Sequence, residues 1–185
     1  MEPADPLDEL LTCRLEFGRR AVEPCTIVIF GASGDLTARK LIPAFYHLRR
    51  EKQLPTPFRI IGFARREKTD DAWRQELRAA LEQYSRTKPI DDAVWTEFAA
   101  NVSYCQGDIT DANAYKKLAN QMASLSDERL RRNLLFYLAT SPSQFGEIVE
   151  RLHQTGLLRK EEGASRTSAW WWRNRSATIW PPRKN

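Results

Sequence analysis

Stretches of consecutive apolar residues alternate along the chain with segments in which apolar residues recur every three or four positions. The apolar stretches lie at 25–30, 58–63, 102–105 and 133–139. Continuous apolar runs of this length are typical of strands in a parallel sheet, because such strands are covered on both faces. A segment with helical spacing follows each of them. The pattern therefore predicts an α/β fold with a doubly wound, Rossmann-like parallel sheet.

The predicted helices cover about 36–48, 71–84, 91–100, 112–125 and 141–153. The second and third begin near acidic residues, which suit the positive end of a helix. Pro43 lies inside the first, where we expect it to bend the helix or to mark a break.

The first strand leads directly into a glycine turn, Gly31-Ala-Ser-Gly34-Asp35, and a helix is predicted to begin immediately after it. Unpaired backbone N–H groups at the start of a helix, together with the helix dipole, favour binding of a phosphate. The spacing is Gly-x-x-Gly and lacks the full Gly-x-Gly-x-x-Gly motif. Two interpretations stay open, namely a phosphate site and glycines that only shape a tight turn.

The second strand is followed by Arg65 and Arg66, where an NAD enzyme would carry Asp or Glu. A guanidinium there can pair with the 2′-phosphate of NADP through two hydrogen bonds, whereas a carboxylate would repel it. Adjacent arginines after a strand can also be merely solvated. Their coincidence with the glycine turn favours NADP.

Longer motifs carry a family resemblance. Residues 27–46, Ile-Val-Ile-Phe-Gly-Ala-Ser-Gly-Asp-Leu-Thr-Ala-Arg-Lys-Leu-Ile-Pro-Ala-Phe-Tyr, resemble the coenzyme fingerprint of glucose-6-phosphate dehydrogenases. Similar segments follow at 61–66, 104–109 and 136–142, although Ser141 stands where many relatives have proline. The resemblance implies an NADP-binding Rossmann domain over about 25–165. Residues 1–24, with mixed charges and prolines and no regular apolar pattern, are expected to be a mobile lead-in.

The resemblance also implies a set of coenzyme contacts. The expected residues are Gly31, Ala32, Ser33, Gly34, Asp35 and Leu36 at the phosphates, Arg65 at the 2′-phosphate, Asp108 and Ile109 beside the adenosine, and Tyr137, Leu138 and Ala139 beneath the coenzyme toward its nicotinamide. We predict no metal ligands.

The family reaction oxidises glucose 6-phosphate with NADP to 6-phosphogluconolactone and NADPH, in the pentose phosphate pathway. In the family, a histidine of a downstream substrate domain takes the C1 hydroxyl proton. The two histidines of this chain, His47 and His153, stand outside the family's sequence context for that base. We therefore predict no catalytic residue. We expect an incomplete Rossmann domain without the substrate domain, which binds NADP at best and has negligible turnover alone.

Residues 166–185 differ from the rest of the chain. They hold four of the six tryptophans, and their five cations without an acid account for the net charge of +5. The Trp run at 170–172 is encoded only by TGGTGGTGG, which reads Val-Val-Glu in a neighbouring register when the Arg173 codon begins with AG. Permitted codons for 173–177 then continue to Lys-Pro-Phe-Gly, a strand motif of the family. We interpret 166–185 as an out-of-frame tail that begins after a slip between about Gly163 and Trp170. A gene in which no register encodes Glu-Lys-Pro-Phe-Gly would disprove this.

Other interpretations concern the partners. Aromatic residues among cations can bind single-stranded nucleic acid or an anionic membrane, but consecutive tryptophans would point in three helical directions, so we expect neither partner. Loss of the family strand would leave a sheet edge uncovered, which favours a homo-oligomer or association through that edge. The alternative function is a stand-alone nucleotide-binding or regulatory module that associates with an intact subunit.

Three cysteines, Cys13, Cys25 and Cys105, are an odd number, and their spacing matches neither a zinc site nor a disulfide framework. We expect reduced thiols without chemistry. No apolar run has the length of a membrane span, and the amino terminus lacks a signal-peptide pattern. These observations predict a cytoplasmic protein.

Overall fold

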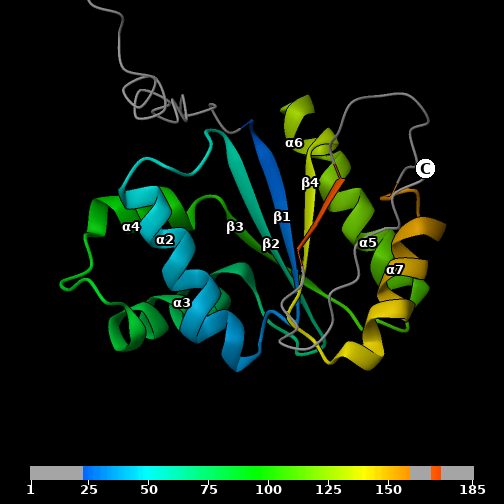
Figure 1. Ribbon diagram of the computed structural model, residues 1–185, viewed down its shortest axis with the longest axis horizontal. Helices are drawn as coiled ribbons and strands as arrows, with labels where there is room; N and C mark the ends of the chain where they lie inside the picture. Colours follow the sequence, from blue (N-terminus) through cyan, green and yellow to red (C-terminus); the bar gives the residue numbers. More distant parts are fainter. Residues whose placement is uncertain (1–22, 159–167, 172–185) are drawn as a thin grey trace, which may run out of the picture.

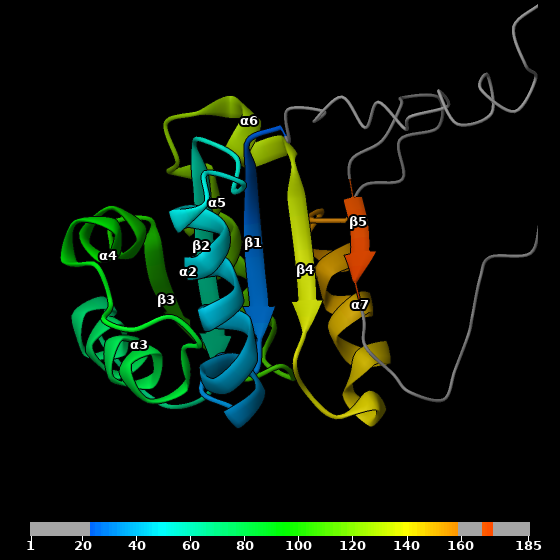
Figure 2. The ribbon, with the colours of Figure 1, turned by 60° about the vertical axis from the view of Figure 1, so that its left-hand side comes forward.

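The strands form one parallel sheet with helices on both faces (Figures 1 and 2). The structure is a computed structural model that describes residues 23–158 and 168–171. The strands are β1 (Cys25–Phe30), β2 (Phe58–Ala64), β3 (Val102–Gln106), β4 (Leu134–Leu138) and β5 (Ser168–Trp171). Their order is β3-β2-β1-β4-β5. The chain thus adds strands to one side of β1 and then to the other, which confirms the predicted doubly wound fold.

The helices match the predicted segments with one addition. They are η1 (Thr37–Leu41), α2 (Ile42–Arg50), α3 (Asp70–Tyr84), α4 (Asp92–Ala99), α5 (Ala112–Ala123), α6 (Glu128–Arg132), η2 (Pro142–Gln144) and α7 (Phe145–Gln154). Helix α6, which the periodicity did not predict, is a single short turn. It begins where the Asp127 carboxylate accepts a hydrogen bond from the Arg129 backbone N–H at 2.8 Å.

The helical segment after the glycine turn continues through Pro43, and the irregularity expected there is a change of helix type just before it. Residues 37–41 form a π-helical turn, and α2 begins at Ile42 with Pro43 in its first turn. Proline has no N–H to donate, so Pro43 leaves one carbonyl of the preceding turn without its usual helical partner.

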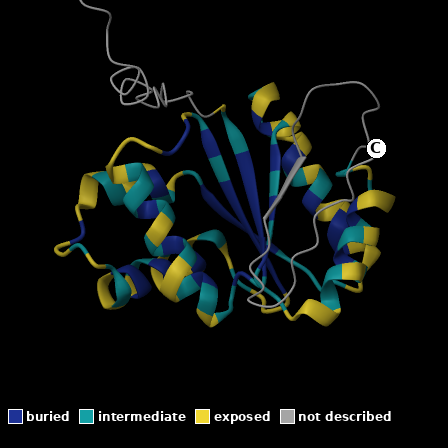
Figure 3. Cartoon of the chain, viewed as in Figure 1, coloured by how far each residue is buried: buried dark blue, intermediate teal, exposed yellow. Residues whose placement is uncertain are grey.

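The sheet separates two apolar cores, because side chains alternate between its faces. Ile27 and Ile29 of β1 pack with α2, α3 and α4, whereas Val28 and Phe30 pack with α5 and α7. Figure 3 shows the central strands as mostly buried and the outer helix surfaces as exposed. Burial on both faces explains the continuous apolar runs in the sequence.

The edge beyond β4 is paired, which corrects the expectation of an edge left uncovered there. Residues 134–137 of β4 pair in parallel with 168–171, inside the segment interpreted as an out-of-frame tail. Backbone groups form this ladder, and any sequence without proline can supply them. Among the described residues, the outermost strand on this side is therefore β5. The rest of 166–185, and the predicted lead-in up to residue 22, lie outside the described residues.

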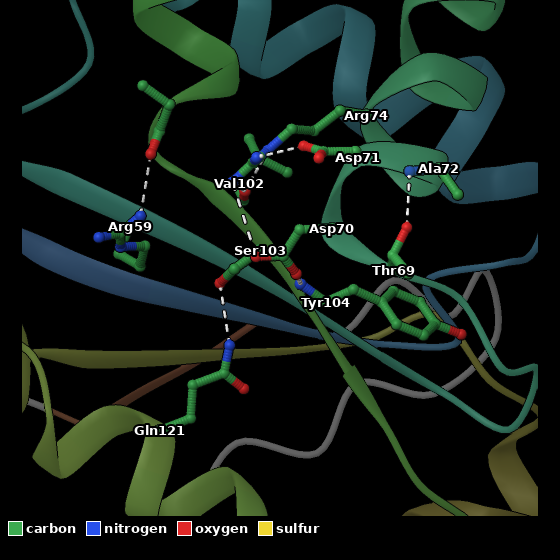
Figure 4. A network of polar contacts seen from close by, with 11 residues as sticks. Arg59, Thr69, Asp70, Asp71, Ala72, Arg74, Val102, Ser103, Tyr104 and Gln121 are labelled. Atoms are coloured by element: carbon green, nitrogen blue, oxygen red, sulfur yellow. Dashed lines mark hydrogen bonds and ion pairs between the residues drawn. The ribbon is translucent and has the colours of Figure 1, made fainter.

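The opposite edge, β3, is closed by side chains of α3 (Figure 4). Asp70 Oδ1 accepts a hydrogen bond from the Tyr104 backbone N–H at 2.7 Å. Arg74 donates to the Val102 carbonyl through Nε at 2.9 Å and Nη2 at 2.7 Å. These backbone groups are the ones that a further strand would pair with, so the two side chains block strand addition at β3.

Candidate functional site

The turn after β1 begins with a glycine whose place no other residue can take. Gly31 has a φ of +86°, a left-handed conformation that L side chains rarely adopt. A Cβ at Gly31 would lie 2.5 Å from the carbonyl oxygen of Ala139, which follows β4. The glycine therefore lets the turn approach β4 at the point where the strand order reverses, the place where open α/β sheets bind ligands.

Backbone hydrogen bonds fix this turn on both sides. The Gly31 N–H donates to the Phe63 carbonyl of β2 at 2.9 Å, and the Ala139 N–H donates to the Phe30 carbonyl at 2.8 Å. The buried Thr37 hydroxyl donates to the Gly31 carbonyl at 3.2 Å. The turn is thus held in one conformation before any ligand arrives.

The remaining turn residues divide into buried and accessible ones. The Ala32 side chain lies in the core, so that residue could offer a ligand only its backbone. Ser33, Gly34 and Leu36 are partly exposed. The exposed Asp35 carboxylate is 2.6 Å from Arg39 Nε. Because this charge is paired, it opposes an incoming phosphate less than a free carboxylate would.

An open hollow of about 440 Å³ lies beyond the carboxyl ends of β2 and β3. Its lining residues are Arg65, Gln106, Gly107, Asp108, Asp111, Asn113, Ala114 and Lys117. The structure thus brings together two of the predicted residues, Arg65 and Asp108, and does not bring Arg66 there. Asn113 and Lys117 could not be predicted from the sequence, since a polar residue on an exposed helix carries no signal that separates a ligand contact from a solvated side chain.

Gly107 forms the floor of this hollow. A Cβ at Gly107 would lie 2.4 Å from Ala114 Cβ and 2.6 Å from Phe63 Cζ. Its N–H donates to the Ala64 carbonyl at 3.0 Å. Glycine therefore allows α5 to approach the end of β3 closely.

The two carboxylates of the hollow are engaged by backbone and hydroxyl donors. Asp108 Oδ1 accepts from the Thr110 N–H at 2.9 Å and from the Thr110 hydroxyl at 2.8 Å. These hydrogen bonds, with a smaller contribution from the charge of Arg65, lower the pKa of Asp108. Asp111 Oδ1 accepts from the Asn113 N–H at 2.9 Å, at the start of α5.

The arginines after β2 are exposed and lack ion partners. Within residues 23–158, neither the Arg65 nor the Arg66 guanidinium forms an ion pair or a hydrogen bond. Arg65 therefore presents unused donors at the hollow, where a phosphate could accept two hydrogen bonds.

The predicted residues at the ends of β3 and β4 face different surroundings. Ile109 is partly buried against the core beneath α5, and its carbonyl accepts from the Tyr115 hydroxyl at 3.0 Å. Leu138 is buried on the same face of the sheet, whereas Tyr137 and Ala139 lie partly buried on the opposite face. Leu138 could therefore meet a ligand only through its backbone.

The switch point also holds a polar atom without a partner. The buried hydroxyl oxygen of Thr140 has no hydrogen-bond partner among the residues that the structure describes. The Thr140 methyl group would be 3.2 Å from a Cβ at Gly31, so this side chain lies beside the glycine turn. A close backbone approach and an unpaired hydroxyl fit a polar ligand at this position.

The histidines lie away from the turn. His47 is in the last turn of α2, where Nε2 is 3.0 Å from Glu51 Oε1, and His153 is in the last turn of α7. Both helices begin near the site, so their last turns are remote from it. The described part of the chain contains no cluster of three His, Cys, Asp or Glu residues suited to a metal ion. Nor does it contain a helix with the length and apolar character that crossing a membrane demands.

Burial favours the thiol form of both cysteines that the structure describes. Burial raises the pKa of Cys105 to about 11, and burial also raises the pKa of Cys25. Neither is disulfide-bonded. Cys13 lies outside the described residues.

Comparisons with known proteins agree with this geometry. Residues 28–167 match the family described as "Glucose-6-phosphate dehydrogenase, NAD binding domain". The glucose-6-phosphate 1-dehydrogenase of Chlamydia muridarum is 41% identical over 145 residues, which are 78% of this chain and 29% of that protein. The corresponding protein of Chlamydia pneumoniae is 41% identical over 144 residues. The chain thus spans less than a third of these relatives' length.

Solved structures show the same fold. The crystal structure of glucose-6-phosphate 1-dehydrogenase from Mycobacterium avium matches with a TM-score of 0.65 and 33% identity, over 78% of this chain and 28% of that one. A glucose-6-phosphate dehydrogenase in complex with its substrate glucose-6-phosphate matches with a TM-score of 0.63 and 30% identity, over 80% of this chain and 29% of that one.

Proposed function

The chain belongs to the glucose-6-phosphate dehydrogenase family, as its nicotinamide-nucleotide-binding domain, and we propose that it binds NADP in preference to NAD. The observation that carries the proposal is the Arg65 guanidinium at the hollow beyond β2, which has no hydrogen-bond or ion partner among the residues that the structure describes. Both carboxylates of the hollow already accept hydrogen bonds from the chain, whereas no described residue uses the donors of Arg65. Lys117 adds a second positive charge at the same surface. The donors of Arg65 and the charge of Lys117 favour NADP, which carries a 2′-phosphate that NAD lacks.

The residues of the switch point would hold the rest of the coenzyme. We assign its diphosphate to the turn from Gly31 to Leu36, with Ala32 contributing only its backbone. We assign the adenosine to the side of Asp108 and Ile109. The nicotinamide end would lie over the end of β4, at Tyr137, Ala139 and the Leu138 backbone. The Thr140 hydroxyl, unpaired among the described residues, is a further donor at this end.

The reaction is proposed for the longer family protein. Bound NADP supplies an acceptor for the hydride from C1 of glucose 6-phosphate, with 6-phosphogluconolactone and NADPH as the products. The described residues include no histidine beside the turn, because His47 and His153 occupy the far ends of their helices. We therefore assign coenzyme binding, and no proton transfer, to this part of the chain.

A matched pair of arginine variants tests the proposal. Arg65→Ala removes the donor at the hollow, and Arg66→Ala removes its neighbour, which does not line the hollow. We expect Arg65→Ala to weaken NADP binding by about 1.5–3 kcal/mol, roughly tenfold or more, with NAD binding unchanged. Arg66→Ala should change the affinity for NADP much less. Isothermal titration calorimetry measures these affinities. Equal binding of NADP by the unaltered chain and Arg65→Ala would contradict the proposal.

A further inference from the structure

The loop that carries Arg65 is bound to β3 through one tyrosine side chain. The Tyr104 hydroxyl donates to the Arg66 carbonyl at 2.7 Å and lies 3.3 Å from the Ala64 carbonyl. These two carbonyls flank Arg65 on either side. A single phenol oxygen therefore holds the backbone before and after the residue to which we assign the 2′-phosphate.

We propose that Tyr104 is a positioning residue for coenzyme selection, whose hydroxyl holds Arg65 where it meets the 2′-phosphate of NADP. The inference rests on the proposed function and adds a second residue to its specificity. Tyr104 itself is only 7% exposed, so we assign it no direct contact with the coenzyme. It acts through the backbone of its neighbour.

Packing holds the Tyr104 ring in place. Its backbone N–H donates to Asp70 Oδ1 at 2.7 Å (Figure 4), and its ring centroid lies 5.4 Å from that of Trp73. Both partners belong to α3, so the tyrosine joins this helix to the loop after β2. Burial also raises the pKa of Tyr104, so its hydroxyl stays a hydrogen-bond donor at neutral pH.

The other contacts of the loop act further along the chain. Lys68 forms an ion pair with Glu76, and the Thr69 hydroxyl accepts from the Ala72 N–H at 3.1 Å. These contacts hold the loop where α3 begins. The Arg65 guanidinium has no hydrogen-bond or ion partner within the described residues. Its position before binding therefore depends on its own backbone, which Tyr104 holds.

Loss of this tyrosine contact should affect only ligands that carry a 2′-phosphate. A donor that is held in place loses less conformational entropy on binding, so a looser loop weakens the contacts that Arg65 makes. NAD has no 2′-phosphate and uses no such contact. Loss of the Tyr104 hydroxyl should thus lower the affinity for NADP while the affinity for NAD stays unchanged.

The test compares Tyr104→Phe with Tyr46→Phe in the full 185-residue chain. Tyr46 is equally a buried tyrosine whose hydroxyl contacts backbone groups, at Asp91, but it lies on α2. Calorimetry measures binding of NADP and NAD, and adenosine 2′,5′-bisphosphate and AMP isolate the 2′-phosphate from the nicotinamide. We expect Tyr104→Phe to weaken both 2′-phosphorylated ligands roughly fivefold, the effect of one ordinary hydrogen bond. NAD and AMP should bind with unchanged affinity. Tyr46→Phe should leave the affinity of NADP relative to NAD, and of adenosine 2′,5′-bisphosphate relative to AMP, unchanged.

Each other outcome overturns the inference in a recognisable way. If Tyr104→Phe binds every ligand as the unaltered chain does, or weakens all of them equally, Tyr104 does not position Arg65. If Tyr46→Phe lowers the ratios as much, the effect is general loosening of the fold. If the unaltered chain shows no preference for NADP, the proposed function itself fails. If Arg65→Ala abolishes the preference for NADP over NAD but Tyr104→Phe keeps it, the proposed function stands and only the inference about Tyr104 is rejected.

Discussion

The indole ring of Trp73 occupies the space that a side chain at Gly62 would need. A Cβ at Gly62 would lie 2.3 Å from Trp73 Cη2 and 2.6 Å from Cζ2, distances that no relaxed side chain shows. Trp73 is fully buried and packs against the ring of Tyr104. The glycine of β2 thus allows α3 to approach the sheet beside the loop that carries Arg65.

We predict that Gly62→Ala destabilises the fold by about 1–3 kcal/mol, the usual cost of overpacking a core. Trp73→Phe removes the part of the indole that a Cβ at Gly62 would meet. The same alanine should therefore cost clearly less in the Trp73→Phe background, because the two sites are in contact. Urea unfolding of both single variants and the double variant measures this coupling. Strictly additive costs would show that the ring is not the obstacle.

The closed edge at β3 yields a second prediction. Arg74→Met removes the two donors to the Val102 carbonyl and exposes a backbone acceptor on the edge strand. We expect concentration-dependent association of this variant, because an edge with unpaired backbone groups can pair with another chain. Light scattering during size-exclusion chromatography measures it.

Arg78→Met is the matched control for that variant. Arg78 lies one turn along α3 and pairs with Glu82 at 2.9 Å and with Asp92 at 2.7 Å, but not with the β3 backbone. It should associate no more than the unaltered chain. Equal association of both variants would mean that loss of charge, and not the opened edge, causes it.

Because Cys105 is buried, we predict that the folded chain loses stability at alkaline pH. Burial raises its pKa in the folded chain from 9.0 to about 11. The folded state therefore keeps the thiol proton where the unfolded state has lost it. This contribution to stability is complete below about pH 9 and is lost as pH rises toward about 11.

Cys105→Ala should flatten the decline of unfolding free energy between about pH 9 and 11, although the smaller side chain lowers stability at every pH. Urea unfolding at several pH values measures both effects. A parallel decline in the two proteins would show that other groups are responsible.

Local sequence patterns were sufficient to predict the strands that are buried on both faces and the positions where the backbone requires a particular residue. Four strands were predicted close to their bounds, because every residue of a doubly covered strand is selected for burial. An irregularity in the helix near Pro43 was expected from its missing N–H, and the helix type changes just before it. A glycine turn between β1 and the next helix was also readable, and the structure adds why Gly31 must be glycine, with a φ of +86° and a carbonyl 2.5 Å from its missing Cβ.

Other features depend on contacts that no local pattern records. Arg65 and Arg66 are adjacent, similar and exposed, and only the packing of β3 and α5 around Gly107 places Arg65 at the hollow. Lys117 reaches the same surface from a helix 52 residues further along the chain. Pairing of β5 with β4 uses backbone groups common to all residues, so its sequence could not predict it.

The sequence by itself thus determined four of the strands, most of the helices and the position of the glycine turn, because burial and backbone conformation restrict residue types locally. Its longer motifs indicated the family. Only the tertiary structure decided which charges meet at the hollow and which hydroxyl holds the loop between them. The Tyr104 hydroxyl and the Arg66 carbonyl are 38 residues apart, and folding alone brings them to 2.7 Å.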